Sequence, residues 1–544
     1  MRRFARAVAS RELILLGLAT PFLLFPGIWT PLGVALIAVA WACRWVATGR
    51  ISARTAMDVP LILMLILVGV SLIPSVDLDL SLNRASIYIL GVALFYGMVN
   101  GLPGERHIHL MGVALVLVGL VVALISLVST DFTIGRIVQL PALYDRLPPP
   151  LIRGLPGSGV IEAYDLVNPR VVAGALAIIL PIPMAYLLMG RGWKLRLASG
   201  LTAAVMLGVL FLTQSPQGFL GLAAALLLLG CWWSKWFLFA SPLGLGGLAA
   251  IVGNNGVRHA LVASFSAEEL DTLAFGMQSR VANGARGVGM IRDMPYTGVG
   301  LNTFPVIDGL YSFGRANAEH AHNLLIQTGV DLGIAGVVAL AALLAGFGYT
   351  VLRAYRTRPE GNQRALLVGI CGGVAAWLAY GMLDSITLGH KPAAALWVML
   401  GLSASMRLRL DAPDAKAFPF PARFSRAWLL AALLPMLALI VVIGLTRDKL
   451  TGAFYLNLGV MEAHRALAAD SEGDAQNHLH LAEVYMQQAL RWDPARARTR
   501  TLLEWVSGGD IDTTRWPRET ASFEPHWRPL VWMAPGPRVA DSMG

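Results

Sequence analysis

Long runs of apolar residues recur along this chain and dominate its pattern. Many of these runs approach the roughly 20 residues that an α-helix needs to cross the hydrocarbon core of a bilayer. The pattern predicts an all-α multi-pass membrane protein with about 13 transmembrane helices. The expected spans are residues 11–28, 31–47, 59–74, 85–101, 109–129, 170–189, 197–213, 218–235, 236–253, 322–349, 364–383, 391–408 and 427–446.

Two long polar stretches interrupt or follow these spans. Residues 254–321 form the largest loop, and residues 447–544 follow the last span. We therefore divide the chain into a polytopic membrane domain, residues 1–446, and a C-terminal tail. Within the tail, Leu481–Pro494 has the spacing of the second half of a tetratricopeptide repeat. One degenerate repeat cannot bury its own apolar face, so we expect this α-helical, TPR-like tail to pack on the loops or on a protein partner.

Composition and charge agree with this picture. The 544 residues are 56% hydrophobic and 14% charged, which is far from the balance of a soluble domain. With the N-terminus in the cytoplasm, the cytoplasmic ends of the spans carry more Lys and Arg than the short outer loops. The net charge of +10 therefore reflects membrane topology, and we expect no nucleic-acid partner. The same orientation places both long polar stretches on the outer side.

The stretch Glu319–Leu325 is the centre of the candidate chemistry. It ends the large loop and carries His320, His322 and Asn323 directly before an apolar run. Asn323 is a favourable N-cap, and the positive end of the helix dipole that follows would face the histidines. Two imidazoles at this boundary suit anion binding and proton transfer.

Basic side chains precede this stretch. Met277–Asp293 has arginines, among them Arg280 and Arg286, between small and apolar residues, which is typical of a helix lying along a membrane surface. Arg170 opens an earlier span and would meet an anionic headgroup or substrate. A snorkelling interface arginine is an equally good interpretation of Arg170.

Acidic candidates are few. Asp384 lies at the outer end of a span, and Lys391 opens the next one. An acid at the edge of a membrane segment is a functional candidate, although a structural Asp384–Lys391 pair explains it equally well. Asp331 lies within a predicted span and must face protein or water. Cys43, Cys231 and Cys371 lack metal-ligand spacing, so we expect no metal site and no cofactor.

Several motifs resemble the central signature of the O-antigen ligase and Wzy polymerase superfamily. The resemblance covers about residues 70–405, with a Wzy_C-like core of about residues 170–405. Its motifs are Pro295–Phe304 with Gly298-Val299-Gly300, His320-Ala321-His322-Asn323, Asp331-Leu332-Gly333, Asn168–Gly174, the turn Thr213–Gly218, and Ser279-Arg280. A lone Gly-x-Gly is a weak phosphate-loop signal. As part of the family pattern, only the His-Ala-His-Asn block together with its Gly-x-Gly partner is specific.

The resemblance implies a GT-C-like fold and a metal-independent, inverting glycosyltransferase. Such an enzyme moves an undecaprenyl-diphosphate-linked glycan to a glycan or lipid acceptor hydroxyl at the outer face of the bacterial inner membrane. Membrane lipids are further partners, and the C-terminus would be periplasmic or extracellular. A polymerase of O-antigen or exopolysaccharide repeats is the favoured interpretation. An O-antigen ligase acting on lipid A-core and a protein O-oligosaccharyltransferase are alternatives.

The resemblance also assigns residues. It makes His322 the general base and Arg280 a ligand of the diphosphate. The other substrate-binding candidates are His320, Asn323, Arg170, Arg286, Asp384 and Lys391. This chain departs from the family in one turn, where Pro216 and Gln217 stand in place of the usual arginine.

Two other classes of function remain open at this level. An anion transporter would place charged residues at mid-membrane and use discontinuous helices in both halves. The charges here gather instead towards one predicted face, which disfavours a transporter. A non-catalytic scaffold is the third interpretation, and it predicts that His322 is dispensable.

Overall fold

The computed structural model describes residues 2–132, 167–234, 267–312, 318–411, 447–467 and 471–508, with residues 144, 147, 150, 151 and 469 between them. Within these ranges every regular element is a helix, apart from one isolated bridge between Thr130 and Val167. The all-α prediction is confirmed. The helices are α1 (Arg2–Ala9), α2 (Glu12–Leu24), α3 (Thr30–Thr48), α4 (Asp58–Ser71), α5 (Leu78–Gly101), α6 (Glu105–Ser129), α8 (Pro169–Ile179), α9 (Pro181–Met189), α10 (Trp193–Leu212), α11 (Pro216–Trp233), α14 (Ala267–Asp293), α15 (Phe304–Ser312), α16 (Leu324–Arg356), α17 (Gly361–Tyr380), α18 (Ala393–Asp411), α20 (Arg447–Leu467), α21 (Glu472–Trp492) and α22 (Ala497–Ser507).

Among the residues that the structure describes, seven helical segments are long and apolar enough to cross a membrane: α3, α5, α6, the α8–α9 pair, α10, α16 and α17. An eighth is added if the bent pair Arg3–Ala9 and Glu12–Leu24 forms one span. α4 is apolar but shorter, as is the helix of Pro216–Trp232. The expected spans 236–253 and 427–446 lie outside the described residues. The protein is therefore a multi-pass membrane protein.

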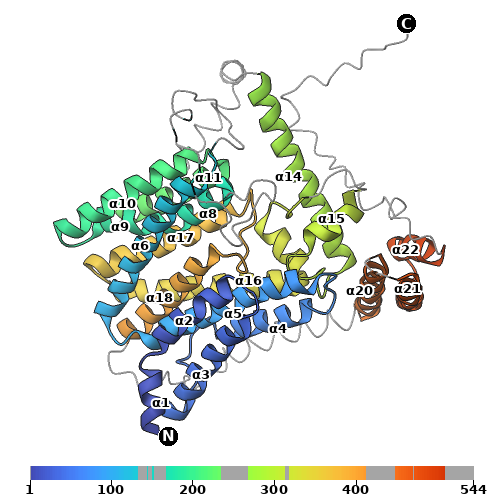
Figure 1. Cartoon of the computed structure of the whole chain (residues 1–544), viewed down its shortest axis with the longest axis horizontal. Coiled ribbons are helices and arrows are strands. Elements are labelled where there is room, and N and C mark those ends of the chain that lie inside the picture. Colours follow the sequence, from blue (N-terminus) through green and yellow to red (C-terminus); the bar gives the residue numbers. More distant parts are fainter. Residues whose placement is uncertain are drawn as a thin grey trace.

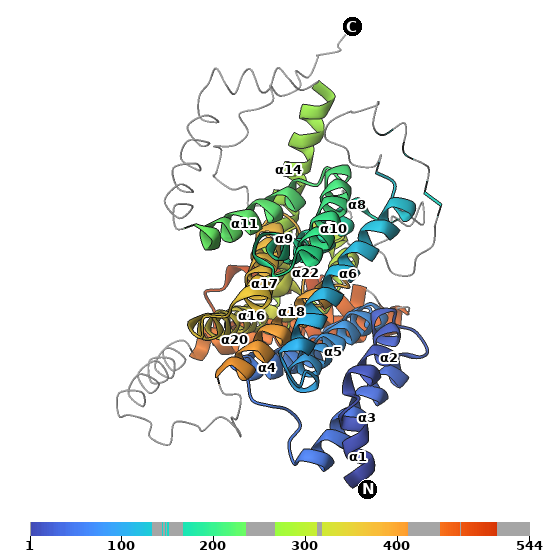
Figure 2. The same cartoon turned by 90° about the vertical axis from the view of Figure 1, so that its left-hand side faces the viewer.

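The long helices form one bundle, with α1–α3 projecting on one side and α14 on another (Figures 1 and 2). Its apolar core joins residues of α4–α6, α8–α10 and α16–α18. Small residues bring some helices very close together. A Cβ on Gly91 of α5 would lie only 2.2 Å from the Trp397 indole of α18.

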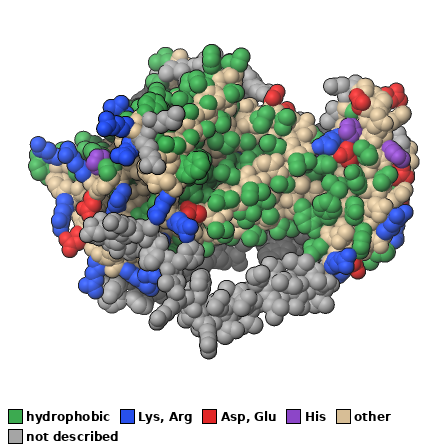
Figure 3. Space-filling model, turned by 90° about the horizontal axis from the view of Figure 1, so that it is seen from below, with side chains coloured by type: hydrophobic (Ala, Val, Ile, Leu, Met, Phe, Trp, Pro, Cys, Tyr) green, Lys and Arg blue, Asp and Glu red, His purple; other side chains and the backbone are tan. Residues whose placement is uncertain are grey.

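One face of the molecule is apolar across its middle. Figure 3 shows hydrophobic side chains covering this region, with Lys and Arg gathered at one end and mixed charges at the other. α4 alone exposes more than half of Val59, Ile62 and Ile66. An apolar surface of this extent between charged ends is the surface that a bilayer covers.

α16 is broken in its third turn by the backbone of Gly333. This residue has φ +71° and ψ −174°, which only glycine adopts readily. Val330 O, the usual helical acceptor for Ile334 N, instead accepts a 2.8 Å hydrogen bond from Val299 N, while Ile334 N donates to Pro295 O at 2.8 Å. The loop before α15 therefore replaces the hydrogen bond that the helix has lost.

The Gly-x-Gly motif provides the close approach that this exchange needs. A Cβ on Gly298 (φ +68°) would lie 2.3 Å from Val330 O, and a Cβ on Gly333 would lie 2.6 Å from Pro295 O. These glycines therefore serve backbone packing, because glycine allows both the left-handed backbone conformation and the close approach of the two segments.

The C-terminal helices pack on this loop. Asn457 of α20 accepts a 3.2 Å hydrogen bond from Tyr296 N and donates a 3.1 Å hydrogen bond to Thr297 Oγ1. The Tyr296 hydroxyl donates to Leu450 O at 2.9 Å. One apolar cluster unites α14, α15, the start of α16 and α20–α22. The expectation that the tail packs on the loops is therefore met for the part of the tail that the structure describes.

Candidate active site

The histidine loop ends at a capped helix, as the sequence predicts. Asn323 Oδ1 accepts hydrogen bonds from Leu325 N at 3.0 Å and Ile326 N at 3.1 Å. Its amide also donates to Met382 O at 3.3 Å, in the loop after α17. Asn323 therefore fixes the start of α16 against α17, and these contacts give it a structural role.

The backbone amides of Ala321 and His322 both donate hydrogen bonds to side chains. Ala321 N donates to Gln327 Oε1 at 2.8 Å, and His322 N donates to His320 Nδ1 at 3.3 Å. Leu324 N donates to a backbone oxygen, Gly381 O, at 2.7 Å. His322 itself has φ +52°, in the left-handed region. The loop is thus held in a conformation that the chain alone would not favour.

A buried network of polar side chains connects this loop to α5 and α16. Gln327 Nε2 donates to Asp331 Oδ1 at 2.8 Å, and Asn302 N donates to the same oxygen at 3.4 Å. Arg84 of α5 in turn donates to Asn302 Oδ1. The prediction that Asp331 must face protein or water is confirmed, because its side chain is buried among protein groups.

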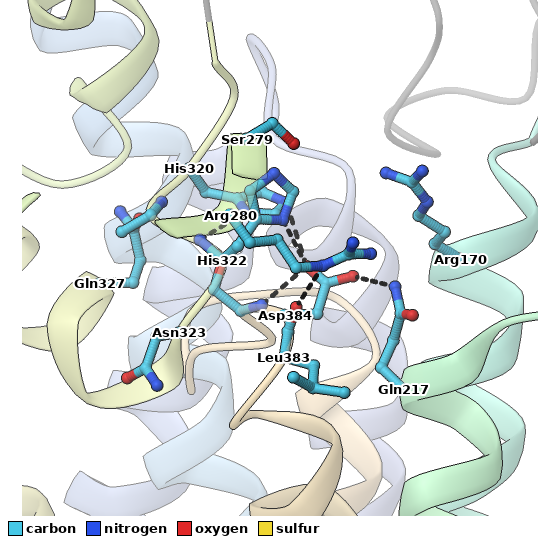
Figure 4. Close-up of polar contacts among 12 residues, drawn as sticks. Arg170, Gln217, Ser279, Arg280, His320, His322, Asn323, Gln327, Leu383 and Asp384 are labelled. Carbon is cyan, nitrogen blue, oxygen red and sulfur yellow. Dashed lines mark hydrogen bonds and ion pairs between the residues drawn. The ribbon is translucent and has the colours of Figure 1, made fainter. Parts of the chain in front are cut away.

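Asp384 is the hub of the site (Figure 4). Its Oδ1 lies 3.3 Å from His320 Nε2 and 3.7 Å from His322 Nδ1, and it accepts a 2.8 Å hydrogen bond from Ser385 N. Its Oδ2 accepts hydrogen bonds from Gln217 Nε2 at 2.9 Å and the Tyr380 hydroxyl at 3.1 Å. Protein groups therefore supply hydrogen bonds to both oxygens of this buried carboxylate.

The electrostatics of the hub fix two protonation states. Burial acts to raise the pKa of Asp384, but the two histidines and the Gln217 hydrogen bond outweigh it and hold that pKa well below its usual range. Burial lowers the pKa of His320 to about 4, against the opposing effect of the Asp384 carboxylate. Near neutral pH the site contains a carboxylate beside a neutral His320.

His322 has a different environment. Its Nδ1 is buried and makes no hydrogen bond, although it points to Asp384 Oδ1 at 3.7 Å. If the His322 ring moves slightly towards Asp384, its Nδ1–H donates a hydrogen bond to the carboxylate. The Nε2 lone pair is then left to accept a proton from the substrate. Among the described residues nothing hydrogen-bonds to that Nε2 atom.

Two predicted arginines flank the hub. Arg280 of α14 donates through Nε to Leu383 O at 3.1 Å and through Nη1 to Gly276 O at 2.8 Å. Figure 4 shows its guanidinium pointing to the side on which exposed Arg170 lies. Burial lowers the pKa of Arg280, and the positive charge of Arg170 lowers it further, against Asp384. Two guanidinium groups whose positive charges repel each other form a site that stabilises a bound anion.

Arg286 and Lys391 lie apart from this arrangement. Arg286 forms a two-oxygen ion pair with buried Asp308, with N–O distances of 2.6 and 3.2 Å. The Lys391 ammonium lies 4.7 Å from the ring centroid of Phe25. Burial lowers the pKa of Lys391 to about 8. The Asp384–Lys391 interpretation is not supported by the Asp384 contacts, which come from the histidines, Gln217, Tyr380 and Ser385.

Sequence reasoning missed three polar residues of the site: Gln217, Gln327 and Tyr380. Gln217 appeared only as a departure from the family pattern. Gln327 and Asp331 are four residues apart on a predicted membrane helix, and this pair of buried polar positions was the available signal. Tyr380 gave no signal, since a tyrosine at a helix end is common at membrane interfaces.

The fold also brings together three potential metal ligands that the sequence did not group. His320, His322 and Asp384 can each offer one atom, and these atoms lie within 4.8 Å of one another. Their donor types would suit a transition metal such as Zn²⁺. Experiment must therefore test the sequence-based expectation that the protein has no metal site.

The comparisons with known proteins address the family. Residues 201–341 match the family model described as O-antigen ligase. No curated protein matches the chain. The matched segment includes Gln217, Arg280, His320 and His322, whereas Arg170 and Asp384 lie outside it. Part of this multi-pass membrane protein is thus similar to the O-antigen ligase family, and the predicted resemblance to the O-antigen ligase and Wzy polymerase superfamily is confirmed.

Proposed function

We propose that this protein is a glycosyltransferase that moves a glycan from undecaprenyl diphosphate to an acceptor hydroxyl at the outer face of the bacterial inner membrane. The observation that carries the proposal is the grouping of His322 with the Asp384 carboxylate beside the Arg170–Arg280 pair. A base, an orienting acid and an anion site are the parts that transfer from a diphosphate requires.

The proposed reaction uses each part once. The acceptor oxygen attacks the anomeric carbon of the donor, and its proton passes to His322 Nε2. The bond from the anomeric carbon to the phosphate oxygen breaks, and the bonding pair leaves with the diphosphate. Arg280 and Arg170 stabilise the departing charge. Attack opposite the leaving group inverts the anomeric configuration, and no metal ion takes part.

Asp384 serves the base rather than the substrate in this mechanism. Its carboxylate favours a proton on His322 Nδ1, which leaves Nε2 unprotonated, and it stabilises the imidazolium that forms. Gln217 and Tyr380 hold the carboxylate in place from α11 and α17. The carboxylate therefore acts through His322.

The test uses purified protein in liposomes, supplied with the host's undecaprenyl-diphosphate oligosaccharide and read on a glycan gel. We expect a ladder of repeats from wild type, which indicates a polymerase. A single shift that requires added lipid A-core would indicate a ligase. His322→Ala and Asp384→Asn should each lose roughly 10²–10⁴-fold in rate.

His480→Ala is the matched control, because His480 is an exposed histidine of α21 that lies outside the candidate site. It should retain wild-type activity. Each variant should also match wild type in expression and melting temperature. Absence of product from wild type with either acceptor would contradict the proposed function.

A further inference from the structure

Both ring nitrogens of His320 face protein groups. Nδ1 accepts the hydrogen bond from His322 N at 3.3 Å, and Nε2 lies 3.3 Å from Asp384 Oδ1. Because Nδ1 is the acceptor, the single ring proton of the neutral imidazole belongs on Nε2, where it points at the carboxylate. His320 thereby connects the orienting acid to the backbone of the base.

His322 needs this support. Its φ of +52° costs about 1–3 kcal/mol for a residue with a Cβ, and such a conformation persists only where the surrounding structure imposes it. The rings of His320 and His322 also pack edge to face, with centroids 4.3 Å apart. One side chain therefore holds both the backbone amide and the ring of His322.

His320 stays neutral because burial and most of the surrounding charges disfavour its protonated form. Burial is the largest cause of its low pKa, and His322, Arg170 and Arg84 lower the pKa further. Asp384 alone acts to raise it. A neutral ring can accept at Nδ1 and donate at Nε2 at the same time, which an imidazolium cannot.

We propose that His320 is a positioning residue: it ties Asp384 to the His322 backbone and does not bind substrate. This inference rests on the proposed role of His322 as the base. It replaces the expectation from the sequence that His320 is a substrate ligand.

Steady-state kinetics of two variants distinguish these roles. In His320→Ala the base is misplaced, so we expect kcat to fall on the order of 100-fold while KM for the lipid-linked donor changes by less than about 3-fold. In His320→Asn the side-chain oxygen takes the place of Nδ1 as acceptor for His322 N, so we expect kcat to recover in part. A variant that retains kcat and raises KM would show a substrate ligand and overturn the proposal.

A second measurement does not depend on enzyme activity. Diethyl pyrocarbonate modifies neutral imidazoles at an available nitrogen, and peptide mass spectrometry locates the adduct. We expect rapid labelling of His322 and protection of His320 in the resting wild-type protein. The His320 side chain is the more exposed of the two, at 20% against 14%, so exposure alone predicts the reverse order.

The two readouts separate the possible failures. Faster labelling of His320 than of His322 would overturn the positioning role, whatever the reaction. The expected labelling order without any glycan transfer by wild type would instead contradict the proposed function and leave the geometry of the pair intact.

Discussion

Gln217 Nε2 donates a 2.9 Å hydrogen bond to Asp384 Oδ2 and so joins the start of α11 to the loop after α17. Both side chains are buried. The family that this chain resembles usually has an arginine in the turn where Gln217 lies. A neutral amide there orients the Asp384 carboxylate without pairing with its charge, which leaves that charge for the histidines.

The first prediction concerns this contact. Gln217→Glu places a second carboxylate against Asp384 in a buried site, so it should raise the pKa of the pair and disturb the hub. We expect a loss of activity of at least about 10-fold, larger than that of Gln217→Ala. Initial rates of glycan transfer measure it, with exposed Gln278→Ala of α14 as the control. Equal rates for Gln217→Glu and wild type would mean that this hydrogen bond is irrelevant to catalysis.

The second prediction separates two arginines of one helix. Arg280 reaches the hub from α14, whereas Arg292 is exposed further along the same helix. If Arg280 binds the diphosphate, Arg280→Ala should reduce kcat/KM by roughly 10–100-fold, which corresponds to the loss of one or two charge-assisted hydrogen bonds. Arg292→Ala should stay near wild type. Similar residual activities in the two purified variants would remove Arg280 from the anion site.

The third prediction tests the joint between the Gly-x-Gly loop and α16. Gly298→Ala or Gly333→Ala should lower the free energy of unfolding by about 1–3 kcal/mol from the backbone conformation alone, with further loss from the backbone atoms that a Cβ would meet. Gly348→Ala is the control, because this glycine lies in the helical part of α16 with open space around it. It should be neutral or slightly stabilising. Melting temperatures in detergent provide the measurement, and a normal value for Gly298→Ala would contradict the close approach.

These features differ in how far the sequence determined them. Asn323 before an apolar run predicted the start of α16, because capping is a local property and the pattern that follows has helical length. The Gln217–Asp384 contact joins residues 167 positions apart, and periodicity describes only one element at a time. The break at Gly333 was also hidden, since its hydrogen bonds are replaced by a loop some 35 residues earlier. The likeness to a known family supplied His322, but only the fold showed that Asp384 stands behind it.

The fourth prediction concerns pH and the docking of the tail. Burial lowers the pKa of His464 in α20 to about 4, although Asp293 of α14 acts to raise it, and the Tyr311 ring of α15 packs nearby. The docked tail therefore binds fewer protons than the released tail between about pH 6.5 and 4, so docking is strongest above this window and weakens as pH falls through it. The difference of about 2.5 pKa units corresponds to roughly 3 kcal/mol at most.

Hydrogen exchange of α20 measures this effect. Protection should decrease between pH 7 and pH 4.5 in wild type after correction for the intrinsic exchange rate. His464→Gln, which does not titrate, should flatten the dependence. A dependence of equal size in the variant would assign the effect to another group.

The last prediction decides whether a metal ion takes part. His320, His322 and Asp384 have the spacing of a ligand set, yet the proposed mechanism uses the His322 Nε2 lone pair for the acceptor proton. Chelators should therefore leave the rate of glycan transfer unchanged. Added Zn²⁺ should inhibit, because coordination by His320 and His322 would draw His322 out of position and occupy its lone pair. His320→Asn should weaken this inhibition, whereas His480→Ala should not change it. Loss of activity on chelation that Zn²⁺ restores would instead make the trio a catalytic metal centre, with His322 as a ligand in place of a base.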